Sequence, residues 1–144
     1  MVQYRTEYQR NPDPADAAKL ANYVARGDVG RVERAAGVRA TPADVDGFQL
    51  VATNAEMTRL HSFTFLKNRA PEELTTGIRD VLQERLNGTY LVGVDVANDG
   101  NNHLHVAEAG DREELYMDRT DIVEFREAVG ERFDEDLADR QVRA

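Results

Sequence analysis

Apolar and polar residues alternate along residues 89–107, a pattern that predicts two β-strands joined by a polar turn. The first strand reads TYLVGVDV, the turn reads ANDGNN, and the second strand reads HLHVA. Because successive side chains of a strand point to opposite faces, His103 and His105 lie on one face and Leu104 on the other. Two of the chain's three histidines therefore share one face, an arrangement that suits a metal ion.

Three segments have the apolar spacing of amphipathic helices. Residues 13–27 begin with an Asp-Pro pair, typical of a helix N-cap and first turn, and end with a glycine. Residues 71–88 begin with a proline and two glutamates and end with Asn-Gly. The third helix is expected to begin at an N-capping Thr120, with these apolar residues facing inwards: Ile122, Phe125, Val129, Phe133 and Leu137.

Three further stretches are predicted to be strands. Residues 48–53 and 57–66 are rich in aromatic, threonine and aliphatic side chains. A short hairpin is expected after the histidine strand, with its second strand at residues 114–117. Within residues 57–66, the alternation places His61 on the same face as Phe63, which makes a hydrogen-bonded core histidine one reading of His61.

The order of strand 57–66, helix 71–88 and strand 90–96 predicts a crossover unit, in which the two strands run parallel. The sequence therefore predicts an α+β fold in a single domain spanning residues 1–144. Its expected architecture is a central, mostly antiparallel sheet of about five strands, with helices packed on one face and a metal or active site on the other.

The segments outside these elements are expected to be irregular. Residues 28–46 are broken by glycines and a proline and are predicted to form a short helix followed by a loop. Residues 1–12 and 138–144 are polar or charged, and we expect them to be mobile.

Composition narrows the classes of function. Because the chain has no cysteine, a metal would take nitrogen and oxygen ligands. The 27 acidic and 18 basic residues give a net charge of −9, and sixteen of the basic residues are arginine. This balance indicates a halophilic source and argues against nucleic-acid binding through the overall field, so such a role needs a local arginine cluster. No signal sequence or apolar span is recognisable, which predicts a cytoplasmic protein without a membrane partner.

A set of motifs follows the chain in a recognisable order. Tyr23-x-x-Arg26 lies on an early helix, and it is followed by a strand with Phe-Thr-Phe, a crossover helix, the string DGNNHLHV and a D-I-V-E-F-R-E helix. This order resembles the HUH endonucleases, named for two histidines around a hydrophobic residue, here His103-Leu104-His105. Within that superfamily it is most similar to the relaxases that begin plasmid conjugation. The resemblance covers roughly residues 15–135.

The resemblance implies a divalent metal ion, magnesium or manganese, held by His103 and His105. Relaxases of this type place another histidine seven residues before the pair, and Val96 occupies that position here. Two residues are candidates to replace that histidine as the third metal ligand. Asp95 would face the pair if the hairpin register is even, and His61 would join it if the two histidine-bearing strands are neighbours. Asp95 is the preferred third ligand, because two imidazoles and a carboxylate suit magnesium or manganese.

The implied reaction is transesterification of single-stranded DNA. A tyrosine hydroxyl attacks a backbone phosphorus, and a 5′-phosphotyrosine holds the strand until it is rejoined. Tyr23 is the candidate nucleophile, because it lies on an early helix with Arg26 one turn away, where a guanidinium can grip the phosphate. Tyr116 is the second candidate, although its neighbours favour a packing role.

The implied partner is single-stranded DNA, with accessory DNA-processing proteins as further partners. Arg59, Arg69 and the arginines of residues 31–39 are candidates to line a DNA groove. Tyr4 and Tyr8 are candidates to stack on bases, and the alternative is that they belong to a disordered tail.

Three classes of function stay open. The first is an active nickase of plasmid mobilisation or rolling-circle initiation. The second is a catalytically degenerate DNA-binding accessory protein, which Val96 and the acidic charge favour. The third is a non-enzymatic structural or interaction protein of a halophilic cell or virus, in which the histidine pair is incidental.

Overall fold

The computed structural model describes residues 2–25, 32–34, 42–96 and 102–135. Within these residues, neighbouring strands pair antiparallel and form one sheet in the order β1-β3-β5-β4-β2. The prediction of an α+β fold with an antiparallel sheet is confirmed. The strands are β1 (Gln3–Arg10), β2 (Val32–Arg34), β3 (Met57–Thr64), β4 (Thr89–Val96) and β5 (Asn102–Gly110). The helices are α1 (Pro14–Ala25), α2 (Pro42–Thr53), α3 (Pro71–Arg85), α4 (Arg112–Leu115) and α5 (Arg119–Arg132).

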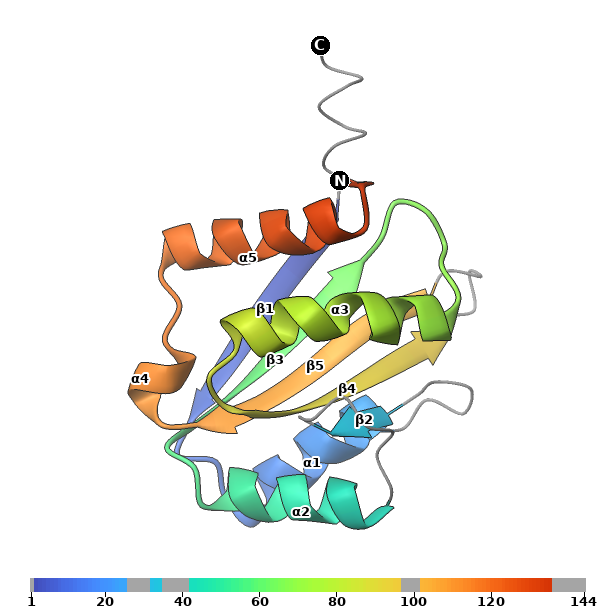
Figure 1. Cartoon of the computed structure of the whole chain (residues 1–144). Coiled ribbons are helices and arrows are strands. Elements are labelled where there is room, and N and C mark those ends of the chain that lie inside the picture. The colour runs from blue at the N-terminus through green and yellow to red at the C-terminus, as the bar shows by residue number, and fades with distance from the viewer. Residues whose placement is uncertain (1, 26–31, 35–41, 97–101, 136–144) are drawn as a thin grey trace.

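Helices cover both faces of the sheet (Figure 1). α3 and α5 lie on one face, and α1 and α2 lie on the other, where they contact β4 and β5. The expectation that helices pack on only one face is therefore wrong. The reason is that Leu91, Ala107 and Ala109 form an apolar surface on the α1 side of the sheet, which α1 and α2 bury.

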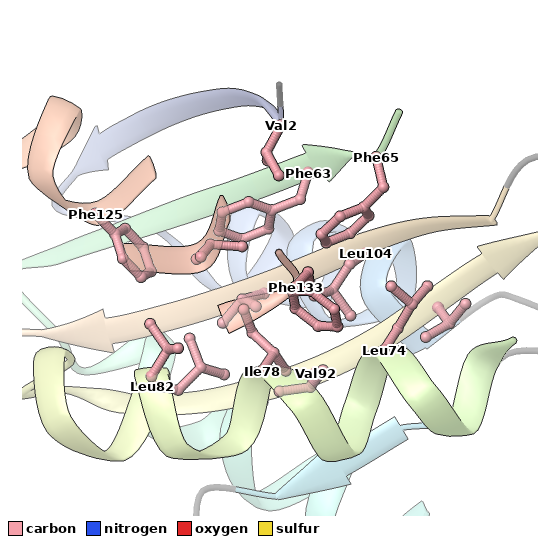
Figure 2. Packing of buried hydrophobic residues seen from close by; sticks show 14 of the residues in the cluster. Val2, Phe63, Phe65, Leu74, Ile78, Leu82, Val92, Leu104, Phe125 and Phe133 are labelled. Carbon is pink, nitrogen blue, oxygen red and sulfur yellow. The ribbon is translucent and has the colours of Figure 1, made fainter. Parts of the chain in front are cut away.

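The larger hydrophobic core lies between the sheet and the two helices α3 and α5 (Figure 2). The strands contribute alternate side chains to it, and each helix contributes residues about one turn apart, as a buried helical stripe requires. None of the labelled core residues is more than 5% exposed. They are Val2, Phe63, Phe65, Leu74, Ile78, Leu82, Val92, Leu104, Phe125 and Phe133.

The expected crossover unit is present with one strand inserted. β3 and β4 run in the same direction, because each pairs antiparallel with β5, which lies between them. The prediction of parallel direction is therefore confirmed, and β5 occupies the centre of the sheet. The strand that carries the histidine pair is thus held by ladders on both sides.

Residues 3–10, which were expected to be mobile, form the edge strand β1. Tyr4 and Thr6 are half-buried between exposed neighbours, which is the alternation of a strand that covers a core with one face. The expectation of mobility is wrong, because this polar segment pairs with β3 along its whole length. Residues 138–144 lie outside the described part of the chain.

Two segments predicted as strands are helical. Residues 48–53 belong to α2, where Phe48 and Ala52 are buried four residues apart while Leu50 and Val51 are exposed. The strand predicted at 114–117 is replaced by the short helix α4, which begins with a capping box. In both segments the local composition favours a strand. Burial of one helical face stabilises the helix at 48–53, and the capping box stabilises α4.

The last helix begins at Arg119, and its N-cap lies two residues before the predicted Thr120. Asp118 is its N-cap, and its side chain accepts a hydrogen bond of 2.8 Å from the backbone N–H of Asp121. Phe125, Val129 and Phe133 are buried as predicted. At the first helix, Asp13 and Asp16 form the same reciprocal pair of hydrogen bonds, with Pro14 as the first helical residue.

The described strand β2 lies within residues 28–46, where a short helix and a loop were expected. β2 pairs with β4 at the edge of the sheet, and α2 begins at Pro42. The rest of this segment lies outside the described residues. None of the helices described in this chain is long and apolar enough to cross a membrane.

Gly93 sets how closely α1 approaches the sheet. A Cβ atom at this position would lie 2.1 Å from the backbone oxygen of Val24 in α1 and 3.0 Å from the Val24 side chain. Backbone cannot withdraw as a flexible side chain can, so only glycine permits this contact. Gly93 is the pairing partner of His105, and the close approach therefore brings α1 down beside the histidine pair.

Replacing Gly93 with alanine is expected to push α1 off the sheet and lower the free energy of unfolding by about 1–3 kcal/mol, as overpacking does. Gly47 provides the matched control. It is exposed in α2 with nothing within 4 Å of an added Cβ, so Gly47→Ala should stabilise the protein by about 0.5–1 kcal/mol. Urea denaturation measures both changes. Equal effects of the two substitutions would contradict the close approach.

Candidate functional site

His103 and His105 lie on β5 on the face of the sheet that α1 covers. β3 supplies a hydroxyl opposite each histidine, because Thr64 pairs with His103 and Ser62 with His105. Each hydroxyl oxygen lies 3.1 Å from Nδ1 of its histidine. These contacts fix the orientation of both rings and engage Nδ1, so a bond to a metal would have to come from Nε2.

Tyr23 lies against this pair. Its ring contacts the His105 ring edge to face, with a centroid distance of 5.0 Å and an interplanar angle of 68°. The predicted nucleophile and the histidine pair therefore lie together on one face of the sheet. They line a cavity of about 290 Å³ whose wall is formed by Gln3, Arg5, Glu7, Tyr23, Leu60, Ser62, Thr64, His103 and His105.

A second hollow of about 540 Å³ shares Glu7, Tyr23 and Leu60 with the first, so the two adjoin along α1. We call them together the Tyr23 groove. Arg5 lines one part and Lys19 the other, which places two cations in it. Glu7 and Asp16 also line the groove, so its walls carry both signs of charge.

Asp95 shares a face with the histidine pair. β4 and β5 pair in a register that sets Asp95 directly opposite His103, so the even register holds. Asp95 and His105 each take part in other interactions as well. Among the described residues, no three His, Asp or Glu side chains lie close enough together to hold a metal ion. The donor types suit magnesium or manganese, but the described residues do not form a complete three-ligand site.

His61 cannot join the pair. β3 does lie beside β5, as expected, but His61 is opposite Val106, whose side chain belongs to the core under α3 and α5. The backbone alternation thus places His61 on the face opposite to His103 and His105. The alternative metal set that includes His61 is therefore wrong.

His61 instead forms the centre of a buried polar network. Its Nδ1 lies 2.6 Å from the Tyr4 hydroxyl, and its Nε2 lies 2.9 Å from Oε1 of Glu108. The other Glu108 oxygen accepts a hydrogen bond of 3.2 Å from the backbone N–H of Gly88. Because a carboxylate only accepts, we assign the proton of the neutral ring to Nε2, and Tyr4 then donates to Nδ1.

Burial sets the protonation of this network. Desolvation lowers the pKa of His61 below its ordinary 6.5, so the ring is neutral in the folded protein. Desolvation also raises the pKa of Tyr4 well above its usual range, so its hydroxyl keeps the proton that it donates. The network is therefore a satisfied part of the core, and Tyr4 is not a base-stacking residue.

The arginines expected to line a DNA groove lie elsewhere. Arg59 is buried on the His61 face, where Nε donates to the Leu115 carbonyl at 3.0 Å. Arg69 donates to the Phe133 carbonyl at 2.7 Å and pairs with Glu73. Both predictions are wrong, because these guanidiniums hold helix ends and loops in place. Arg26, Arg31 and Arg39 lie outside the described residues, as does the side chain of Arg34.

The second candidate nucleophile and the second stacking candidate are both exposed. Tyr116 follows α4 with 67% of its surface exposed and does not line the Tyr23 groove. Tyr8 is 57% exposed and lies beside Arg59, whose guanidinium carbon is 5.4 Å from the Tyr8 ring centre. Tyr116 is therefore not placed to act with the histidine pair, whereas Tyr8 lines the Tyr23 groove.

Arg5, Ser62 and Thr64 are site residues that sequence reasoning missed. The alternation of residues 57–66 already puts Ser62 and Thr64 on the face opposite His61, so pairing this strand with the histidine strand would have found them. Arg5 was hidden because residues 1–12 were not recognised as a strand.

Comparison with known proteins assigns no family. No protein-family model matches the sequence, and no curated protein matches it. The chemistry of the Tyr23 groove is therefore the basis for assigning a function.

Lowering the pH below about 6.5 should destabilise the protein through His61, by at most about 1.4 kcal/mol per pH unit. The pKa of His61 is lowered on folding, so in acid the unfolded chain binds a proton that the folded chain does not. The contribution of neutral His61 to the free energy of unfolding is therefore complete above the pKa that His61 has in the unfolded chain. It is lost as the pH falls below that pKa.

His61→Gln tests this assignment, because an amide can still donate to Glu108 but cannot take up a proton. The variant should lose about 1–3 kcal/mol at neutral pH and show a shallower decline in stability below pH 6.5. Urea denaturation over a pH series measures both. An unchanged pH slope in the variant would show that His61 is not the titrating group.

Proposed function

We propose that the chain binds single-stranded DNA in the Tyr23 groove and nicks and rejoins it through a phosphotyrosine, in the manner of the HUH endonucleases. The observation that carries the proposal is the contact between the Tyr23 ring and His105, in a cavity that His103 also lines. A nucleophile-bearing helix and an HUH pair come from segments about eighty residues apart in the chain, and here they face each other.

Each group has a defined part in this reaction. The Tyr23 hydroxyl forms a bond to phosphorus as the P–O3′ bond breaks, which leaves a 5′-phosphotyrosine and a 3′-hydroxyl. Ser62 and Thr64 hold the two imidazoles in a fixed orientation, so that the site is rigid before DNA binds. A magnesium or manganese ion on His103 and His105, with Asp95 on the same face, would polarise the phosphate.

Local cations support DNA binding by a protein whose net charge is −9. Arg5 and Lys19 line the Tyr23 groove. DNA phosphates bound there would therefore lie near positive side chains, although the net charge of the protein is negative. The Arg5 side chain is 84% exposed, and its 3.7 Å contact with Glu7 is a weak surface pair that a phosphate can replace.

A second candidate function is single-stranded DNA binding without cleavage. It is favoured by the finding that the described residues contain no three-ligand metal group. In that case the protein keeps the groove and acts as an accessory protein to another nuclease. The two functions differ in whether a covalent protein–DNA adduct forms.

Incubation with end-labelled, random-sequence single-stranded DNA and Mn²⁺ should give an adduct that survives denaturing electrophoresis. Tyr23→Phe should abolish the adduct while leaving DNA binding in place, because it removes only the nucleophilic oxygen. Tyr116→Phe is the matched control, since Tyr116 is exposed and does not line the Tyr23 groove, and it should react as the wild type does. His103→Ala with His105→Ala should lower the yield by at least about tenfold, the size of a lost metal-site interaction.

DNA binding without an adduct in the wild type would establish the second candidate in place of the first. An adduct that persists in Tyr23→Phe would contradict Tyr23 as the nucleophile. The absence of both binding and adduct would contradict both functions.

A further inference from the structure

β1 is the outermost strand of the sheet. It pairs with β3 along eight residues, and in the described part of the chain no strand pairs with its other side. Six of its eight residues are exposed. A long edge strand presents unpaired backbone N–H and C=O groups, which are a template for another strand unless the side chains prevent pairing.

The sequence of β1 is complementary to itself when read in the opposite direction. Residues 3–9 read QYRTEYQ, with Thr6 at the centre. In an antiparallel pair of two such strands centred on Thr6, Arg5 lies opposite Glu7 of the second copy. Tyr4 then lies opposite Tyr8, and Gln3 opposite Gln9. Every pair in this register is therefore a favourable or neutral one.

We propose that two copies of this chain associate through their β1 strands, antiparallel and centred on Thr6, to form one continuous sheet across a twofold axis. Such an interface is isologous, because the same strand faces itself in the two copies. The partner is a second copy of the same chain, and the argument for it is the charge and side-chain complementarity of the strand. The dimer does not depend on the proposed DNA function.

The faces of the sheet agree with this register. Arg5 pairs with Ser62 and Glu7 with Leu60, so both charged residues lie on the α1 side. Tyr4 and Tyr8 lie on the other side, opposite Phe63 and Arg59. Residues placed opposite one another across an antiparallel pair point to the same face, and the proposed pairs meet this condition.

Repulsion between like charges disfavours the neighbouring registers, which are centred on Arg5 or on Glu7. A shift that centres the pair on Arg5 puts the two Arg5 side chains opposite each other, and a shift to Glu7 does the same with two glutamates. Like charges directly opposite are destabilising, so only the register centred on Thr6 satisfies both residues. Arg5 and Glu7 are 84% and 71% exposed, which leaves both available for contacts across the axis.

The dimer would have a consequence for the Tyr23 groove. Arg5 and Glu7 line that groove, so the two grooves lie on the same face of the joined sheet, on either side of the twofold axis.

Charge reversal tests the register with the full chain. Glu7→Arg sets Arg5 opposite a second arginine at both symmetric positions, and Arg5→Glu sets Glu7 opposite a second glutamate. Each variant alone should raise the dimer dissociation constant by about tenfold or more. A mixture of the two variants should form a heterodimer, because the glutamates of one chain then face the arginines of the other at both positions. Sedimentation velocity over a concentration series at low salt measures all three.

Arg10→Glu is the matched control, since this substitution reverses one charge on the same strand at a position that faces Val2 in the proposed register. It should dimerise as the wild type does. The proposal is overturned if the wild type stays monomeric over the whole concentration series. Dimers of either single variant as strong as the wild type's, or the failure of two folded variants to associate on mixing, would also overturn it. Circular dichroism shows whether each variant is folded.

Discussion

The pairing of β3 with β5 decides where every polar group at the centre of the sheet lies. Because side chains alternate along both strands, this register sends His103 and His105 towards α1 and His61 towards α5. The same alternation gives each histidine a hydrogen-bond partner on the neighbouring strand. A shift of β5 by one residue would turn the histidine pair into the large core and Leu104 and Val106 out of it, so burial of the core and geometry of the site depend on one register.

The close packing of α1 converts this face into a site. Gly93 lets the backbone of Val24 rest on β4, and Tyr23, the preceding residue, then meets His105. β1 completes the wall with Arg5 and Glu7, which are exposed on the sheet edge. A small glycine, a short helix and a polar edge strand thus assemble a groove that contains a tyrosine, two imidazoles and two cations. The proposed self-pairing of β1 would place two such grooves on one surface.

Sequence patterns found the elements whose signals are local and strong. Helix α1 was predicted correctly from Asp13-Pro14, and α3 from Pro71. The β4–β5 hairpin was predicted correctly from the alternation around His103. Residues 48–53 were misread because a short apolar run has no clear period, and only burial of Phe48 and Ala52 reveals the helix. The side on which His61 lies depends on the register of β3 against β5, which sets His61 opposite Val106, and that long-range register leaves no trace in local sequence. The edge strand β1 was missed because its residues are polar, although Tyr4 anchors it in the core.

We propose that Tyr23, His103 and His105 form one DNA-facing site, whereas His61 belongs to the core behind the sheet. Nuclear magnetic resonance of the histidine rings tests it directly, with Mn²⁺ added in the presence of a single-stranded oligonucleotide. Paramagnetic broadening falls steeply with distance from the ion. If Tyr23 and the histidine pair form one site, the His103 and His105 signals broaden at the lowest Mn²⁺ concentrations, the Tyr23 signal follows, and the His61 signal broadens last. Broadening of His61 together with or before the pair would contradict the proposal, as would signals that do not respond to the ion or the DNA.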